Sequence, residues 1–217
     1  MSADKIPVTL VLLGMVALFL VLRLRSILGT RQGLEGSPAG SARRAPPPVI
    51  DAKAEAPATP ARILPVPDSP AGEALAAMQK LDKNFNPSVF LTGAEGAFRL
   101  IVTAFAAGDR DKLRPLLMPH AFAAFEQAIA AREAAGETQR SEIRGILEAT
   151  IEAAALDGSI ATITVRFVSH QIAVTTAADG SIVTGADAVT ELADVWEFQR
   201  DLKDRAPAWR LVSAHSA

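Results

Sequence analysis

An alternation of apolar and polar residues near the C-terminus limits the possible folds of this chain more than any other feature. Between residues 190 and 202 the even positions carry the large side chains, whereas the odd positions are mostly charged or small. This period of two predicts a half-buried β-strand. Its inward side chains are Leu192, Trp196, Phe198 and Leu202. A polar segment with a proline follows, and then a second apolar run at residues 209–212. The two runs predict a hairpin that closes an antiparallel sheet.

Helical periodicity dominates residues 70–136, upstream of the strands. Apolar stripes with the spacing of an α-helix are Leu75, Met78, Leu81 and Phe85; Ala94, Ala97, Phe98, Ile101, Val102 and Phe105; Leu113, Leu116 and Leu117; and Phe122, Phe125 and Ile129. Asn86-Pro87 is a helix-start signal, and Thr92 with Glu95 predicts a capping box. Gly108 and Gly136 are expected to end helices, and Asp109 and Pro119 to begin them.

From Glu142 the period changes to two. The inward residues expected on the first strand are Ile143, Leu147 and Ile151, and those on the second are Ile163, Val165 and Phe167. Asp157-Gly158 and Asp179-Gly180 predict turns. After Ser169 the apolar positions switch to Ile172 and Val174, which predicts a β-bulge or bend. Helices followed by strands indicate an α+β fold, with helices on one face of an antiparallel sheet.

The order of these segments resembles the Tim-forty-four-like domain. The resemblance rests on DVWEFQRD followed by AWRLV, and it extends back through ITVRFVS and GDRDKLRPLL to cover residues 87–212. That family is named after a peripheral subunit of the mitochondrial inner-membrane protein translocase and also occurs in bacterial membrane proteins. The resemblance implies a cone of helices on a curved sheet, similar to the nuclear-transport-factor-two-like superfamily. It also implies a role in protein translocation, membrane-protein assembly or chaperone recruitment.

An uncharged apolar run near the N-terminus predicts a membrane anchor at residues 1–28. Residues 6–22 carry no charge over 17 positions, which as a helix spans about 25 Å of the roughly 30 Å hydrocarbon core. A cleaved signal peptide is the alternative, but Arg23 and Arg25 stand where a small-residue cleavage site is needed. These arginines outnumber Lys5 on the other side, so the C-terminal part is expected in the cytoplasm. With the bacterial relatives in view, we expect the bacterial inner membrane.

Residues 29–70 hold nine of the fourteen prolines and predict a disordered linker, which leaves residues 71–217 as the folded domain. The first seventy residues carry a net charge of +3 and residues 71–217 carry −5. A weakly acidic domain lacks the basic surface that nucleic-acid binding needs. We therefore expect no nucleic-acid partner, whereas the predicted anchor implies the lipid bilayer and the family resemblance implies membrane or translocation-associated proteins as partners.

No catalytic constellation stands out, and we expect no enzyme activity, cofactor or metal. The chain has no cysteine and no tyrosine, and its three histidines are scattered. Asp194 is the carboxylate to watch, because it shares the inward parity of its strand. An acid there could serve an isomerase-like site, but a buried aspartate is more often paired, and Arg200 or Arg166 are the expected partners.

The sequence favours a non-enzymatic adaptor, tethered to the inner membrane, that binds partner proteins; the alternative is a carrier or sensor of an apolar ligand or lipid. In either case the expected binding site is apolar and lies between the helices and the sheet, where it would take an apolar peptide or acyl chain. Its predicted residues are Phe98, Ile101, Phe105, Phe122, Phe125, Phe167, Trp196, Phe198 and Trp209.

Overall fold

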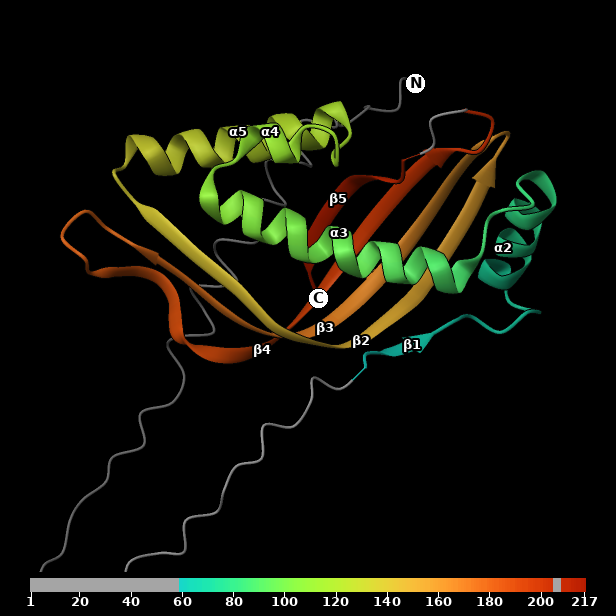
Figure 1. The fold of residues 1–217 in the computed structure, drawn as a ribbon, viewed down its shortest axis with the longest axis horizontal. Helices are drawn as coiled ribbons and strands as arrows, with labels where there is room; N and C mark the ends of the chain where they lie inside the picture. Colours follow the sequence, from blue (N-terminus) through green and yellow to red (C-terminus); the bar gives the residue numbers. More distant parts are fainter. Residues whose placement is uncertain (1–58, 205–207) are drawn as a thin grey trace, which may run out of the picture. The chain divides into compact units, whose positions relative to one another are not determined.

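The computed structural model of the protein describes residues 59–204 and 208–217. Within them, helices cover one face of a five-stranded sheet (Figure 1). The helices are α2 (Pro70–Leu81), α3 (Pro87–Ala107), α4 (Arg110–Leu113) and α5 (Pro119–Ala134). The strands are β1 (Ala61–Ile63), β2 (Thr138–Asp157), β3 (Ile160–Thr176), β4 (Ile182–Asp201) and β5 (Arg210–Ser216). The predicted α+β fold, with helices on a curved sheet, is confirmed.

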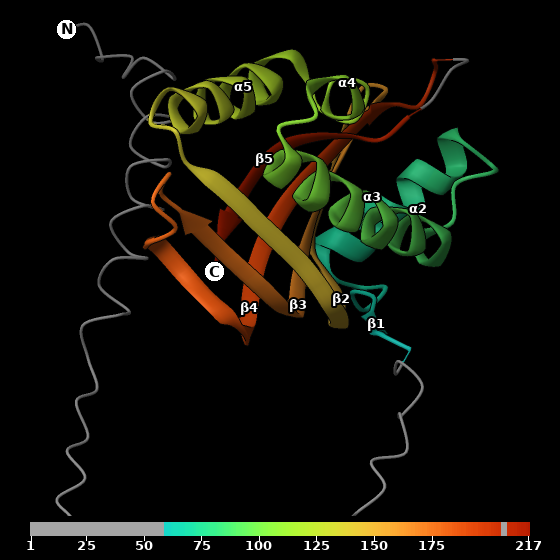
Figure 2. The same ribbon diagram turned by 60° about the vertical axis from the view of Figure 1, so that its left-hand side comes forward.

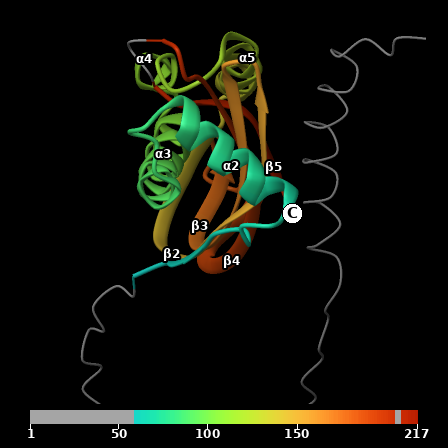
Figure 3. The same ribbon diagram turned by 90° about the vertical axis from the view of Figure 1, so that its right-hand side faces the viewer.

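The strands follow chain order across the sheet. β2 to β5 are antiparallel neighbours, whereas β1 joins the outer edge of β2 in the parallel direction. The long strands β2, β3 and β4 curve beneath the helices (Figure 2). Viewed from the end that carries α2, α3 lies to one side of these strands and α2 crosses in front of them (Figure 3). α2 and α3 pack on β2, and α5 packs beside β5.

The start of α3 is set by Asn86 rather than by the predicted capping box. The Asn86 side chain accepts hydrogen bonds from the first backbone N–H groups of the helix, and Pro87 occupies the first turn. Thr92 lies one turn further in, where its hydroxyl donates to the carbonyl of Ser88. The box at Thr92 is therefore wrong as a helix start, because the upstream Asn-Pro pair already satisfies the orphan N–H groups.

The other predicted helix ends are set by local sequence, as expected. Gly108 ends α3 with a φ of 69°, in the left-handed region that favours glycine. Asp109 caps α4 through the N–H of Lys112, and Pro119 opens α5. The first stripe is only partly right. Leu75 and Met78 are buried, but α2 ends at Leu81, which is 41% exposed, and Phe85 reaches the core from the loop beyond.

Strand parity is predicted well in β3 and only in part in β2, where Ile151 is buried as expected and Ile143 packs against the core. In β3, Ile163, Val165 and Phe167 are fully buried, and the bulge predicted after Ser169 appears as a register shift between Gln171 and Ala173. β2 carries three register shifts against β3. Each shift exchanges the inner and outer faces. Hence Ile146 is buried, whereas Leu147, which we expected to face inward, is 37% exposed.

The C-terminal hairpin is confirmed, with a longer second strand than predicted. Trp196, Phe198 and Leu202 are buried, and Leu192 is half-buried. The returning strand β5 runs on to Ser216, well past the predicted end at residue 212. Its backbone also bonds to the segment between α4 and α5, because the N–H of Leu211 donates to Leu116 and its carbonyl accepts from Met118.

The predicted anchor at residues 1–28, with its flanks Lys5, Arg23 and Arg25, lies outside the described residues, as does the linker up to residue 58. Residues 59–69, also assigned to that linker, belong instead to the folded unit and contain β1. Within the described part of the chain, α3 is the one helix whose length and composition would suit a membrane span. Its buried side chains, among them Phe98 and Ile101, form part of the core.

Candidate partner-binding site

Four of the predicted binding residues form a closed ring cluster between α3 and the sheet. Phe98 stacks on Phe167 with ring centroids 4.6 Å apart, and Trp196 meets Phe98 edge-on at 4.7 Å. Phe198 lies 6.2 Å from Trp196. Each of the four is at most 4% exposed. These rings fill the core, as does Ile101, and they satisfy the geometry that aromatic pairs prefer.

Two rings outside the predicted binding set, Phe85 and Phe90, extend this cluster to Trp209, and Phe90 was not singled out in the sequence at all. Phe90 meets Phe198 at 6.0 Å and Trp209 at 4.7 Å, and Phe85 lies 5.9 Å from Trp209. Phe90 was missed because it precedes Thr92, the expected helix start. The helix-start signal at Asn86-Pro87 would have placed it on the first turn. Trp209 itself is half-buried, so the cluster reaches the surface at this end.

The remaining predicted rings lie apart from the cluster. Phe105 of α3 and Phe125 of α5 form an edge-on pair at 5.1 Å, and both are half-buried. Phe122 is buried and lies 4.3 Å from the guanidinium of Arg114. The nine predicted residues therefore divide into a closed core group and a smaller accessible group. Phe105, Phe125 and Trp209 make up that accessible group.

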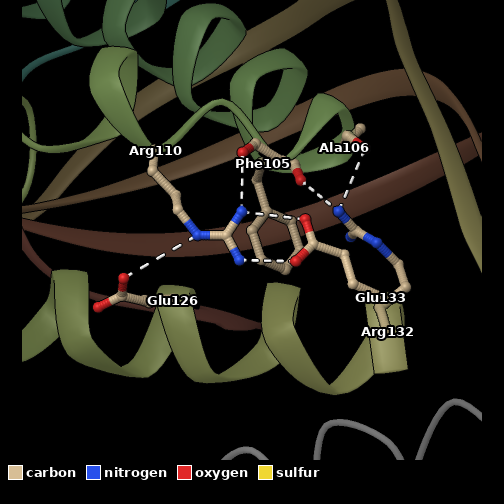
Figure 4. Close-up of polar contacts among 7 residues, drawn as sticks. Phe105, Ala106, Arg110, Glu126, Arg132 and Glu133 are labelled. Atoms are coloured by element: carbon tan, nitrogen blue, oxygen red, sulfur yellow. Dashed lines mark hydrogen bonds and ion pairs between the residues drawn. The ribbon is translucent and has the colours of Figure 1, made fainter. Parts of the chain in front are cut away.

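A network of arginines and glutamates holds α3, α4 and α5 together beside Phe105 (Figure 4). Arg132 lies over the Phe105 ring and donates to the carbonyls of Phe105 and Ala106, at 2.9 and 3.2 Å. These are carbonyls of the last turn of α3, where a cation is favoured. Arg110 donates two hydrogen bonds to Glu133, at 2.9 and 2.8 Å. The network therefore joins the C-terminal end of α3, which carries Phe105, to α4 and α5.

The pKa values of three side chains in this network are shifted, and hydrogen bonds or burial are the main causes. The hydrogen bonds from Arg110 lower the pKa of Glu133 and raise the pKa of Arg110 itself. Burial lowers the pKa of the Arg132 guanidinium. These shifts have structural causes, and the groups involved have protein partners.

Asp194, the carboxylate singled out as a possible acid, is part of a polar row on the inner face of the sheet. The amide of Gln171 donates to Asp194 at 3.1 Å and to the hydroxyl of Ser169 at 2.8 Å. The arginines expected beside it have other partners. Arg200 pairs with Asp82 at 2.7 Å, and Arg166 faces two glutamates of β2 on the outer face.

The histidines do not converge. His120 bonds to the carbonyl of Val212 at 3.1 Å, and His170 faces Glu191 at 3.6 Å. Within residues 59–204 and 208–217, no three His, Cys, Asp or Glu side chains gather in a group that could hold a metal ion.

The contact that the sequence analysis did not foresee lies at the edge of the sheet. Arg62 of β1 donates from Nε to Glu95 Oε1 at 2.7 Å and from Nη2 to Glu95 Oε2 at 2.9 Å. Glu95 is buried on α3, between Ala94 and Phe98 of the apolar stripe. The sequence signal that could have indicated this contact is a carboxylate inside an apolar helix stripe, because a buried charge needs a partner.

Two surface hollows of the described unit lie away from the ring cluster. One is formed by residues 65, 66 and 69–71 together with Glu152, Ala153 and Ala154 of β2. The other is surrounded by the far ends of β2, β3 and β4. Arg140 and Asp187, which form an ion pair, line the second hollow.

The sequence model of the Tim44-like domain matches residues 71–216. The chain belongs to the Tim44-like domain family. The resemblance drawn from the hairpin and the preceding segments is thereby confirmed. No curated protein matches the sequence at a significant level.

Solved structures similar to the Tim44-like domain of this chain include the intermembrane space region of the chloroplast protein ARC6. It is 10% identical with a TM-score of 0.42, over 58% of this chain and 95% of that one. A conserved protein from Planctomyces limnophilus is 17% identical with a TM-score of 0.37, over 59% and 94%. A putative dehydratase of the NTF2-like family from Streptomyces avermitilis is 13% identical with a TM-score of 0.34, over 60% and 96%.

The edge strand β1 precedes the residues that match the Tim44-like family model. The match begins at residue 71, whereas the strand ends at residue 63. Glu95, the partner of Arg62, is inside the matched region. The Tim44-like domain of this chain therefore receives an additional strand from the segment that connects it to the N-terminal residues.

Proposed function

We propose that this protein is a non-enzymatic, single-span adaptor that holds partner proteins at the bacterial inner membrane, with its Tim44-like domain in the cytoplasm. The proposal connects the domain to protein translocation or membrane-protein assembly. The observation that carries it is the Tim44-like match at residues 71–216 in a chain whose residues 6–22 are uncharged and long enough to approach a full span.

The contacts of the domain support binding rather than chemistry. The inner-face carboxylate Asp194 accepts from Gln171, and the ion pairs of the inner side join elements of the fold to one another. An acid–base site needs a group poised to take or give a proton within reach of a substrate. The polar side chains in these three contacts are engaged within the fold, and we place recognition at the surface and the sheet edges.

The membrane part of the proposal is tested by fractionation. The protein should stay with the membrane after carbonate extraction, and protease added outside intact spheroplasts should leave residues 71–217 uncut. Moving Arg23 and Arg25 to the N-terminal side of the span should disturb this orientation, because flanking positive charge sets it. Recovery of a shortened chain from the periplasm would refute the anchor.

The adaptor part is tested by cross-linking in cells, followed by affinity purification from solubilised membranes. Translocation or assembly components should copurify with the full chain. A chain that ends at residue 70 is the matched control, because it retains the proposed anchor and lacks the Tim44-like domain. Equal recovery with both chains would show that the domain does not recruit them.

Binding of an apolar peptide or acyl chain is a second candidate, favoured by the half-buried pair Phe105 and Phe125. Titration of an apolar fluorescent probe should show weaker binding to Phe105→Ser than to the unmodified chain. Leu100→Ser is the control, since Leu100 is an exposed residue of the same helix. Equal losses in both variants would place the probe elsewhere.

A further inference from the structure

We propose that the outer edge of β2 at Glu148–Thr150 is a strand-acceptor site for an extended, arginine-bearing segment of a partner protein. In this structure residues 61–63 of the chain itself occupy it. The inference rests on the proposed adaptor function, because it states what kind of segment the adaptor takes.

The present occupant shows how an extended segment binds at this edge. Ala61, Arg62 and Ile63 lie parallel to β2, opposite Glu148, Ala149 and Thr150. Neighbouring residues in a ladder point to the same face of a sheet. Arg62 therefore points to the inner face with the buried Ala149, and there it meets Glu95 of α3. Backbone pairing supplies affinity in such strand addition, and the side-chain contact supplies specificity.

Glu95 makes the site selective for arginine. Its side chain is 10% exposed, and both oxygens accept from the guanidinium of Arg62. A planar guanidinium matches a carboxylate in this two-bond geometry, which a lysine ammonium does not. An acceptor edge without an arginine beside it would leave a buried carboxylate unpaired. The partner segment must therefore bring an arginine to the position of Arg62.

Apart from the Arg62–Glu95 contact, the backbone pairing of the present occupant is short. β1 is three residues long, and all three are exposed. Pro65 and Pro67 follow, and proline cannot donate to a ladder. Among the described residues, no strand pairs with this edge of β2 beyond Thr150. The hollow beside Glu152, Ala153 and Ala154 lies along the same edge.

The connection to α2 fixes where the occupant would separate from the edge. At Gly72 an added Cβ would lie 2.2 Å from the carbonyl oxygen of Val66, so the 66–67 backbone packs closely on the start of α2. The Ser69 side chain donates to that same carbonyl and caps the helix. The turn is thus anchored, and exchange at the edge needs only residues before it to move.

These observations define the partner segment. It is extended and parallel to β2, with an arginine opposite Ala149 and aliphatic, non-proline residues after it. Such a segment continues the ladder past Thr150 and fills the hollow that the proline-rich chain leaves open. It therefore gains backbone pairing and apolar contact that residues 61–63 cannot make.

The test uses the full chain in a mild detergent and a labelled peptide with the sequence of residues 59–66 and a Pro65→Val change. Binding is measured by fluorescence anisotropy. The Arg62→Ala chain should bind the peptide at least about tenfold more tightly than the unmodified chain. In the unmodified chain residues 61–63 are a tethered competitor at an effective concentration near millimolar, and the substitution weakens that competitor. Adding Glu95→Gln to that variant should remove about the same factor.

A second peptide with alanine in place of its arginine separates the acceptor from general stickiness. It should bind Arg62→Ala weakly, and its affinity should not change when Glu95→Gln is added to that variant. Arg110→Ala is the protein control, since it breaks another two-bond pair, with Glu133, away from the edge. Circular dichroism establishes that each variant is folded. If Glu95→Gln unfolds the chain, the difference in affinity between the two peptides on the folded Arg62→Ala chain still tests the proposal.

The proposal is overturned if both peptides bind Arg62→Ala equally, or if Arg62→Ala gains no affinity. Exchange of residues 61–63 between two copies would appear as a mass that rises with concentration in light scattering, and it would assign the edge to self-association. Peptide binding without any copurified membrane protein would leave the acceptor standing and refute the adaptor function, so the two failures are distinguishable.

Discussion

Replacement of Phe98 by alanine tests the central claim that the aromatic rings form a rigid core. Phe98 is fully buried on α3, stacked on Phe167 at 4.6 Å and in edge contact with Trp196 at 4.7 Å. Removal of a buried phenylalanine costs about 3–5 kcal/mol. The upper half of that range is expected, because two ring contacts are lost at about 0.5–1.5 kcal/mol each beyond the buried area.

Such a loss is a large share of the roughly 5–15 kcal/mol that stabilises a domain. For a unit of this size a loss in the upper half of the roughly 3–5 kcal/mol range lowers Tm by about 8–20 °C, at roughly 2–4 °C per kcal/mol. Urea unfolding of the full chain in a mild detergent measures the loss in the free energy of unfolding. Far-UV circular dichroism is the readout, because the fluorescence of Trp196 changes directly when its neighbour is removed.

Two further substitutions on α3 make the measurement specific. Phe98→Leu keeps an apolar side chain but removes the ring, and should cost less than Phe98→Ala. Val89→Ala is the surface control: Val89 is 69% exposed on the same helix, and its change should stay within about 0.5 kcal/mol. A loss below about 1 kcal/mol for Phe98→Ala would refute the packed-core interpretation and would point to rings that line an open site.

Three other perturbations have defined outcomes. Removing residues 59–64 from the isolated folded unit takes away β1 and leaves the Ser69 cap of α2 in place; it should cost about 1.5–3 kcal/mol in a thermal melt, the range for hydrogen bonds to a charged group, because Glu95 loses its partner, and an unchanged melt would contradict that pairing. Asp82→Ala should cost about 3–5 kcal/mol, since it leaves the guanidinium of its β4 partner buried and unpaired, and a double replacement of the pair by apolar residues should recover part of the loss. The pKa of Glu133 is lowered by Arg110, so this pair stabilises the fold above the ordinary glutamate pKa and the contribution disappears as pH falls through the lowered pKa; Arg110→Gln should remove that part of the acid dependence from a stability titration.

Several elements were determined by local sequence because their causes lie within a few residues. Asn86-Pro87 and Gly108 bound α3 through hydrogen bonds and backbone angles that involve the adjacent turn alone. Asp109 caps α4 in the same way. The period-two pattern of β4 identified Trp196 and Phe198 as inward residues, since alternation is a property of the single strand.

The inner face of β2 could be determined only in part in this manner, with Ile143 and Ile151 right and Leu147 wrong. Its bulges depend on pairing with β3, a strand that a single-strand pattern does not contain. One shift suffices to turn Leu147 outward and Ile146 inward, against the pattern of polar residues around them. The predicted binding residues likewise share an inward direction in the sequence. Only packing separates the closed rings around Phe98 from the accessible pair at Phe105.

The sequence alone thus determined the class of fold, its family and the ends of most helices, because each of these follows from local patterns and their order. The tertiary structure decided which charges meet. Arg62 and Glu95 are 33 positions apart and belong, by composition, to a proline-rich linker and an apolar helix. Their contact exists because a three-residue strand lies on the edge of β2 directly below α3. A pairing of that kind depends on sheet geometry, which neither segment encodes by itself.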